Sequence, residues 1–178
     1  MHPLGVGDAV WAQWGTAFLG SNAVAVALVV LASWAPRTAR ALFALGFIAA
    51  SVVNTRLTLV DPLAYLDYAE WAAAPYRAFI LGPFSAHPAL FVLPIAAGQL
   101  ACGLMLGLGG GRMARLGALG AAVFLVAIGP LGFGSAFPAT IVMAAGVVFV
   151  RALLPEESPV ELFRTWLDRR RTAMAPAS

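Results

Sequence analysis

A charge-free apolar run near the start of the chain reads WGTAFLGSNAVAVALVVLASW and covers Trp14 to Trp34. A helix that crosses the hydrocarbon core of a bilayer needs roughly 20 mostly apolar residues, and this run has that length. Tryptophan is enriched where a membrane meets water, and one tryptophan stands at each end of the run. A cleaved signal peptide is the alternative, but the residues before the run carry Asp8 and no arginine, and the run is too long for a typical signal core. The run therefore predicts a membrane-spanning helix.

The composition extends this prediction to the whole chain. Of its 178 residues, 61% are hydrophobic and only 11% are charged, and the mean hydropathy is +0.87. A soluble domain is roughly half apolar and about a quarter charged, and a chain this short cannot hide the excess apolar surface inside a globule. Lipid must cover that surface, so we expect an integral membrane protein.

Further apolar runs follow, separated by short turns and by one long loop. Together they predict an all-α fold, a transmembrane helix bundle that occupies residues 1–155. We expect five spans, over residues 14–34, 41–60, 88–108, 116–133 and 137–154, with an outer loop at 61–87.

The arginines alternate between the two sides of this bundle. All 11 basic residues are arginine, and only Arg56 and Arg77 fall in loops on one side. By the positive-inside rule, the arginine-rich side is cytoplasmic. We therefore expect a multi-pass protein of a bacterial inner (plasma) membrane, with the N-terminus outside and the C-terminus in the cytoplasm. Topology accounts for the net charge of +3, so no nucleic-acid partner is expected. The cytoplasmic arginines are Arg37, Arg40, Arg112, Arg115, Arg151, Arg164, Arg169, Arg170 and Arg171.

Two segments outside the spans carry helix signals. In the outer loop, Asp61 followed by Pro62 suits a helix start, and a helix over Leu63–Ala74 would lie on or in the outer membrane surface. Residues 156–172 predict an amphipathic helix on the cytoplasmic surface, followed by a disordered tail at 173–178. Anionic lipid would hold that helix through surface residues Trp166, Arg169, Arg170 and Arg171.

Polar groups at membrane depth are costly, so those near the outer side are candidates for a ligand site. An outer cavity roofed by the loop helix could bring them together. For Gln99, a hydrogen bond to a neighbouring helix is the alternative. For the loop acids Asp61, Asp67 and Glu70, the alternatives are a solvated face or an ion pair with Arg56. The candidate ligand-binding residues are Asn54, Arg56, Tyr65, Tyr68, Arg77 and Gln99.

No catalytic motif stands out. A phosphate-binding GxxxxGK[ST] loop, a HExxH helix and a GxSxG elbow are all missing from the sequence. Only two histidines occur, so a metal site lacks nitrogen ligands. We therefore predict no catalytic residue, no metal site and no evident cofactor, while a quinone or a lipid stays open as a ligand.

Several stretches carry a likeness to a known family: Ala39–Phe47, Asn54–Thr55, Asp61–Tyr65, Pro75–Arg77, Ala96–Leu100, Gly103–Leu104 and Arg115–Gly120. Through them, residues 37–151 resemble the DoxX-like family of small bacterial four-helix membrane proteins. The resemblance implies a four-helix core to which the first helix is an addition. It also implies a redox link, because some relatives are described as subunits of membrane oxidoreductases that pass electrons to quinone. At Gln99 the chain departs from the family, whose members often carry an acidic residue there.

Three functions follow from these observations. We expect a non-catalytic subunit or scaffold of a membrane complex, whose partners are the lipid bilayer and either another membrane protein or a second copy of the chain. The first alternative is a quinone- or lipid-binding membrane oxidoreductase subunit. The second is a small transporter, which is disfavoured because only Gln99 lies near the midplane and no inverted repeat is evident.

Overall fold

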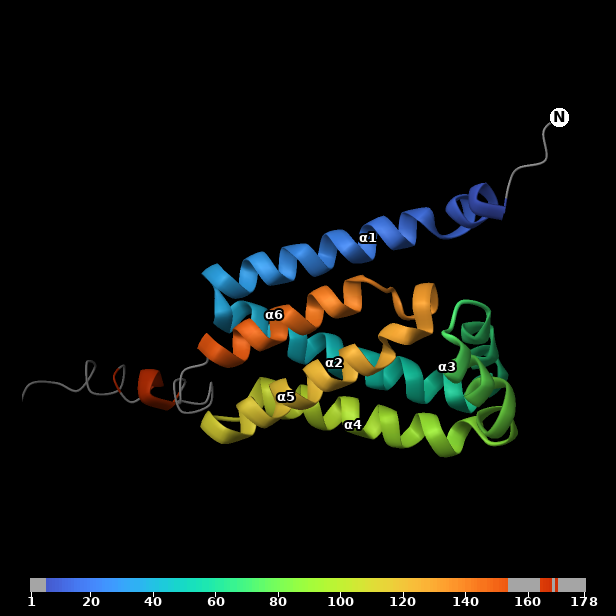
Figure 1. The fold of residues 1–178 in the computed structure, drawn as a ribbon. Coiled ribbons are helices and arrows are strands. Elements are labelled where there is room, and N and C mark those ends of the chain that lie inside the picture. The colour runs from blue at the N-terminus through green and yellow to red at the C-terminus, as the bar shows by residue number, and fades with distance from the viewer. Residues whose placement is uncertain (1–5, 154–163, 168, 170–178) are drawn as a thin grey trace, which may run out of the picture.

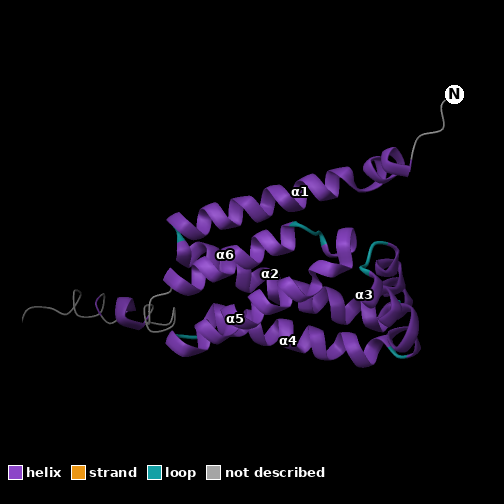
Figure 2. Cartoon of the chain, viewed as in Figure 1, coloured by secondary structure: helices purple, strands orange, loops and turns teal. Residues whose placement is uncertain are grey.

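The structure is a computed structural model that describes residues 6–153, 164–167 and 169. Over these residues every regular element is a helix, as Figure 2 shows, so the predicted all-α class is confirmed. The predicted amphipathic helix at 156–172 and the tail at 173–178 fall outside the described residues, apart from a helical piece at 164–167 and residue 169.

The long helices run antiparallel in chain order, so that each returns beside the one before it (Figure 1). We call one end of the bundle the turn end, where Ala35 and Gly109–Gly110 join helices. The other end is the cap end, which the segment 62–84 covers. The helices are α1 (Val6–Trp34), α2 (Pro36–Val60), α4 (Pro88–Leu108), α5 (Gly111–Ile128) and α6 (Ala139–Leu153).

Four helical stretches are long and apolar enough to cross a membrane, namely 15–34, 36–60, 88–108 and 111–135. The membrane helix bundle is therefore confirmed. The fifth predicted span, 137–154, is represented by α6, which is apolar but has only 15 described residues. At about 1.5 Å per residue α6 is roughly 22 Å long, whereas a hydrocarbon core is about 30 Å thick.

Helix boundaries follow proline chemistry. Pro36 and Pro88 stand in the first turns of α2 and α4, where a missing backbone N–H costs nothing. Because Pro36 starts a helix, α2 begins five residues before the predicted span 41–60, and the turn that was expected to hold Arg37 and Arg40 shrinks to Ala35.

Small residues let the helices approach closely. Alanines dominate the buried core, together with Phe43, Phe47 and Leu106. A Cβ added at Gly103 would lie 2.9 Å from the carbonyl oxygen of Ala44, so α2 and α4 touch backbone to backbone there. Helix α1 packs on the outside of the bundle, mainly against α6 and α2 (Figure 1).

The cap end is built from short helices. They are the 3₁₀ helix η1 (Pro62–Glu70), α3 (Ala74–Phe79), the π-helical turn η2 (Ile80–Phe84) and the 3₁₀ helix η3 (Gly129–Ser135). The loop helix expected over Leu63–Ala74 is thus a 3₁₀ helix that ends earlier. The backbone N–H of Ala73 donates to the carbonyl of Pro130 at 2.8 Å, which joins the cap to η3.

Candidate functional site

A polar network joins α2 to α4 in the half of the bundle nearer the cap. The side-chain amide of Asn54 donates through Nδ2 to Oε1 of Gln99 at 2.8 Å. Gln99 is only 4% exposed. The two residues belong to neighbouring antiparallel helices, so the amide pair bridges a helix–helix contact.

Tyr65 brings the cap into this network. Its hydroxyl lies 3.0 Å from the backbone oxygen of Asn54 and 3.2 Å from Asn54 Oδ1, and it can donate its one proton to either. The hydroxyl of Thr58 also donates to the Asn54 carbonyl, at 2.7 Å. One turn earlier in α2, Ser51 donates to the backbone oxygen of Ala96 in α4 at 2.7 Å. The polar face of α2 is therefore satisfied from within the protein.

The amide of Gln99 has one unused side. Because Asn54 Oδ1 faces Tyr65 and Asn54 Nδ2 faces Gln99, Gln99 uses its oxygen, and its NH₂ group has no hydrogen-bond partner among the described residues. Gln99 lines a cavity of about 170 Å³ between α2, α4 and α5. The rings of Phe47 and Phe124 also line it, edge to face at 5.8 Å, and so does Cys102. The amide of Gln99 therefore lines the same cavity as two aromatic rings.

The 3₁₀ form of η1 sorts its side chains into faces. A 3₁₀ helix has three residues per turn, so residues three apart eclipse one another. Tyr65 and Tyr68 stack on the inner face, with ring centroids 6.1 Å apart and planes at 18°. Asp67 and Glu70 share another face, and both are exposed. The loop acids therefore form an acidic edge on the outside of the cap.

Tyr68 is held tightly on that inner face. Its ring leaves no room for a side chain at Gly134, and burial together with the nearby Tyr65 raises the pKa of the Tyr68 phenol. Its neutral form is therefore the one that fits the cap.

The remaining predicted residues lie apart from the network. Arg56 and Arg77 are exposed and, in the part of the chain that the structure describes, neither hydrogen-bonds to Asn54, Tyr65 or Gln99. Among the same residues no ion pair joins Arg56 to the loop acids, which are exposed as well. Of the predicted membrane-surface residues, Trp166 and Arg169 are exposed, while Arg170 and Arg171 lie outside the described residues.

Arg40 is a structural cation that the sequence did not single out. Its side chain is 4% exposed, and the guanidinium donates from Nε to the carbonyl of Leu106 and from Nη2 to that of Gly109. These are carbonyls at the C-terminal end of α4, where no further turn of helix can bond them and where the helix dipole favours a cation. Arg40 therefore caps α4 from α2.

Comparisons with known proteins do not assign this chain to a family. No protein-family profile, no curated protein and no solved structure matches this chain. Among the described residues, no three His, Cys, Asp or Glu side chains gather as metal ligands would. What the residues define is a membrane helix bundle with a polar network under its cap.

Proposed function

We propose that this chain is a non-catalytic subunit or scaffold of a membrane complex, and that its cap holds a partner protein. The observation that carries the proposal is the attachment of the cap. Tyr65 hydrogen-bonds to Asn54 of α2, and the Tyr76 hydroxyl donates to the carbonyl of Ala127 in α5 at 2.7 Å. Hydrogen bonds from two cap side chains to two helices of the bundle hold the cap in place, which suits a docking surface better than a moving lid.

The charge on the cap supports docking to a protein. Asp67 and Glu70 lie on one exposed edge of η1, and Arg56 and Arg77 are exposed at the same end of the bundle. Charged groups arranged in this way steer a partner of complementary charge and fix its orientation. The partner expected on the acidic edge is therefore a protein with a basic patch.

The arginine distribution supports an orientation for the complex. Among residues 6–153, five arginines lie toward the turn end and only Arg56 and Arg77 lie toward the cap end; the five are Arg37, Arg40, Arg112, Arg115 and Arg151. The positive-inside rule then puts the turn end in the cytoplasm of a bacterial cell and the cap outside the inner membrane. In this proposal the partner docks from outside, α6 completes a fifth crossing, and the resemblance to DoxX-like proteins suggests a redox partner.

Gentle extraction from the native membrane tests this proposal. We expect a second polypeptide at a fixed ratio in mild detergent, detected by native mass spectrometry. The Asp67→Asn/Glu70→Gln variant should lose that polypeptide, because it removes the acidic edge and leaves the buried network intact. Arg37→Gln changes one exposed charge at the opposite end and is the matched control. A wild-type chain that runs alone as a monodisperse species contradicts the proposal.

A second candidate function rests on the unpaired amide of Gln99. An N–H donor that lines one cavity with Phe47 and Phe124 suits a flat, apolar molecule with a carbonyl oxygen, such as a quinone headgroup. Organic extraction of the purified protein should then release such a molecule at about one equivalent, and Gln99→Leu should abolish it. Ser51→Ala is the control, since Ser51 bonds only the backbone of α4. Extracts that hold bulk phospholipid alone would exclude this function.

A further inference from the structure

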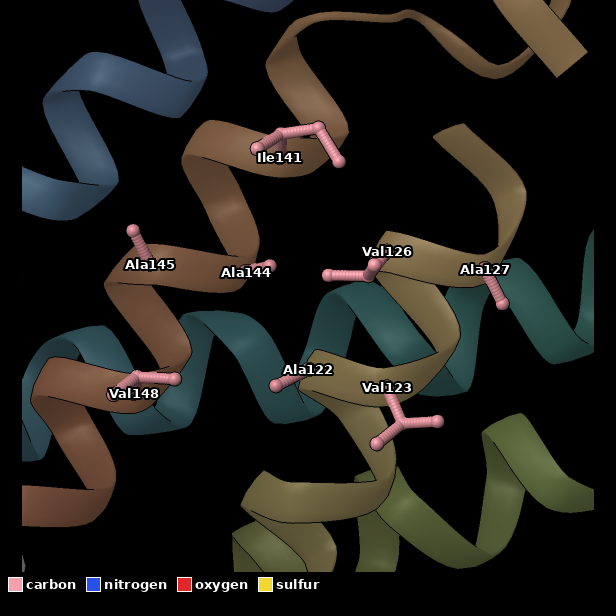
Figure 3. A pocket seen from close by; sticks show the side chains of 8 residues that line it. All are labelled: Ala122, Val123, Val126, Ala127, Ile141, Ala144, Ala145 and Val148. Carbon is pink, nitrogen blue, oxygen red and sulfur yellow. The ribbon is translucent and has the colours of Figure 1, made fainter. Parts of the chain in front are cut away.

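A groove between α5 and α6 runs along the outside of the bundle. It has a volume of about 550 Å³ and is lined only by alanine, valine and isoleucine side chains. Figure 3 shows Val126 of α5 and Ala144 of α6 pointing toward one another across the open space. Alanine is too short to close the gap between the helices, so the groove persists.

The groove has the dimensions of a segment of lipid chain. It extends along α6 from Ile141 to Val148, which is about 10 Å at 1.5 Å per residue. It opens sideways from two apolar helices of a membrane bundle, so the hydrocarbon of the bilayer is its natural surroundings. At the cap end, Tyr76 donates its hydroxyl to the carbonyl of Ala127, one of the lining residues.

Two arginines lie in helical register with the groove at its other end. Residues seven apart fall within about 20° of one another on an α-helix. Arg151 lies seven residues after Ala144 in α6, and Arg115 lies seven residues before Ala122 in α5. Both arginines are exposed. The apolar groove therefore leads, on both of its helices, to a cation toward the turn end.

We propose that this groove binds one anionic phospholipid, with an acyl chain between α5 and α6 and the phosphate at Arg115 and Arg151. The positive charge of the two arginines distinguishes between two possible occupants, a partner helix and a phospholipid. A partner helix would need only the small side chains, whereas a phospholipid uses both the apolar walls and the arginines. Basic sites between membrane helices attract anionic headgroups, and arginine matches the geometry of a phosphate. This inference depends on the membrane bundle and not on the proposed docking function.

Native mass spectrometry of the full chain released from nanodiscs tests the proposal. The nanodiscs contain equal amounts of phosphatidylglycerol, which is anionic, and phosphatidylcholine, which is not. We expect wild type to retain one phosphatidylglycerol, at about tenfold preference or more. Arg115→Gln/Arg151→Gln should bring the preference to about one. Arg37→Gln, an exposed arginine on α2, should keep it.

The apolar half of the site is tested separately. Ala144→Leu fills the groove and should remove retained lipid of both kinds, while Ala97→Leu adds the same atoms to an exposed face of α4 and should change nothing. If Ala144→Leu fails to fold, the arginine variants still decide the question. Equal retention of the two lipids by wild type, or a lipid-free dimer that Ala144→Leu dissociates, would overturn the proposal.

Discussion

Asn54 and Gln99 are 45 positions apart in the chain and share a hydrogen bond of 2.8 Å that ties α2 to α4. This bond lies under the cap, where Tyr65 approaches both oxygens of Asn54. The pair thus links two apolar helices to each other and to the segment between them.

We expect Gln99→Leu to lower the free energy of unfolding by about 0.5–2 kcal/mol, because it leaves the partly buried Asn54 amide without an acceptor. The double variant Asn54→Leu/Gln99→Leu should cost less than the sum of the single variants, because neither partner is then left unpaired. Unfolding in mixed micelles, followed by circular dichroism, measures all three. Strictly additive effects would show that the amide pair contributes no coupling.

Arg40→Met should destabilise the protein by about 2–3 kcal/mol, because hydrogen bonds from a charged donor to the carbonyls of Leu106 and Gly109 are lost. Arg40→Lys should recover little of this, since an ammonium lacks the planar fork that reaches two carbonyls at once. Arg37→Met is the control and should stay within about 0.5 kcal/mol of wild type, because Arg37 is exposed. The same unfolding assay applies. Equal losses of unfolding free energy for Arg37→Met and Arg40→Met would contradict the role of Arg40 at the end of α4.

Gly103→Ala should destabilise by about 1–3 kcal/mol, because the new methyl group would press on the backbone of Ala44 and force α2 and α4 apart. Gly98→Ala, one position from Gln99 on the same helix, meets no atom within 4 Å. It should be neutral or slightly stabilising, since alanine favours the helix over glycine. The thermal midpoints of the two variants, compared in one detergent, test this difference. Equal midpoints would show that the close approach at Gly103 is unimportant.

Tyr68 should titrate above the ordinary tyrosine value of 10.0, because burial and the neighbouring Tyr65 oppose its ionisation. A folded-state pKa above the unfolded one means that Tyr68 contributes its full stability below about pH 10 and loses it as pH rises through the raised pKa. The tyrosinate absorbance of wild type minus that of Tyr68→Phe measures the titration. A midpoint at or below 10 contradicts the buried position.

Hydropathy predicted the helices better than their ends. The span 88–108 coincides with α4, and the first span ends at Trp34 as α1 does. The start of α2 was placed late because its first turn carries two arginines, and a hydropathy pattern cannot tell that Arg40 folds inward to cap another helix. The span 116–133 merges the end of α5 with η3, since Gly129–Pro130 changes the helix type without lowering the hydropathy.

The sequence predicted some residues of the candidate site and missed others, and the difference has a physical reason. Asn54, Tyr65 and Gln99 were found because polar groups are conspicuous in apolar runs. Ser51 and Thr58 were missed, although they stand at i−3 and i+4 from Asn54 and so share its helical face. The three-residue spacing of Tyr65, Tyr68 and Trp71 was a signal for a 3₁₀ helix with one aromatic face. Which helix receives Arg40 depends on pairing across the chain, which local periodicity does not encode.

The packing of α1 against α6 has a consequence for biosynthesis. Helix α1 is synthesised well before α6, which is one of its main neighbours, and the one-residue connection at Ala35 joins α1 to α2 from the start. The two would enter the lipid as a hairpin, with one side of α1 uncovered until α6 has been synthesised. A chain truncated before Ala139 would keep α2, α4 and α5 yet leave that side of the hairpin permanently open. We expect quality control in the cell to recognise such a helix, with one face left unpacked, as a sign of unfinished assembly.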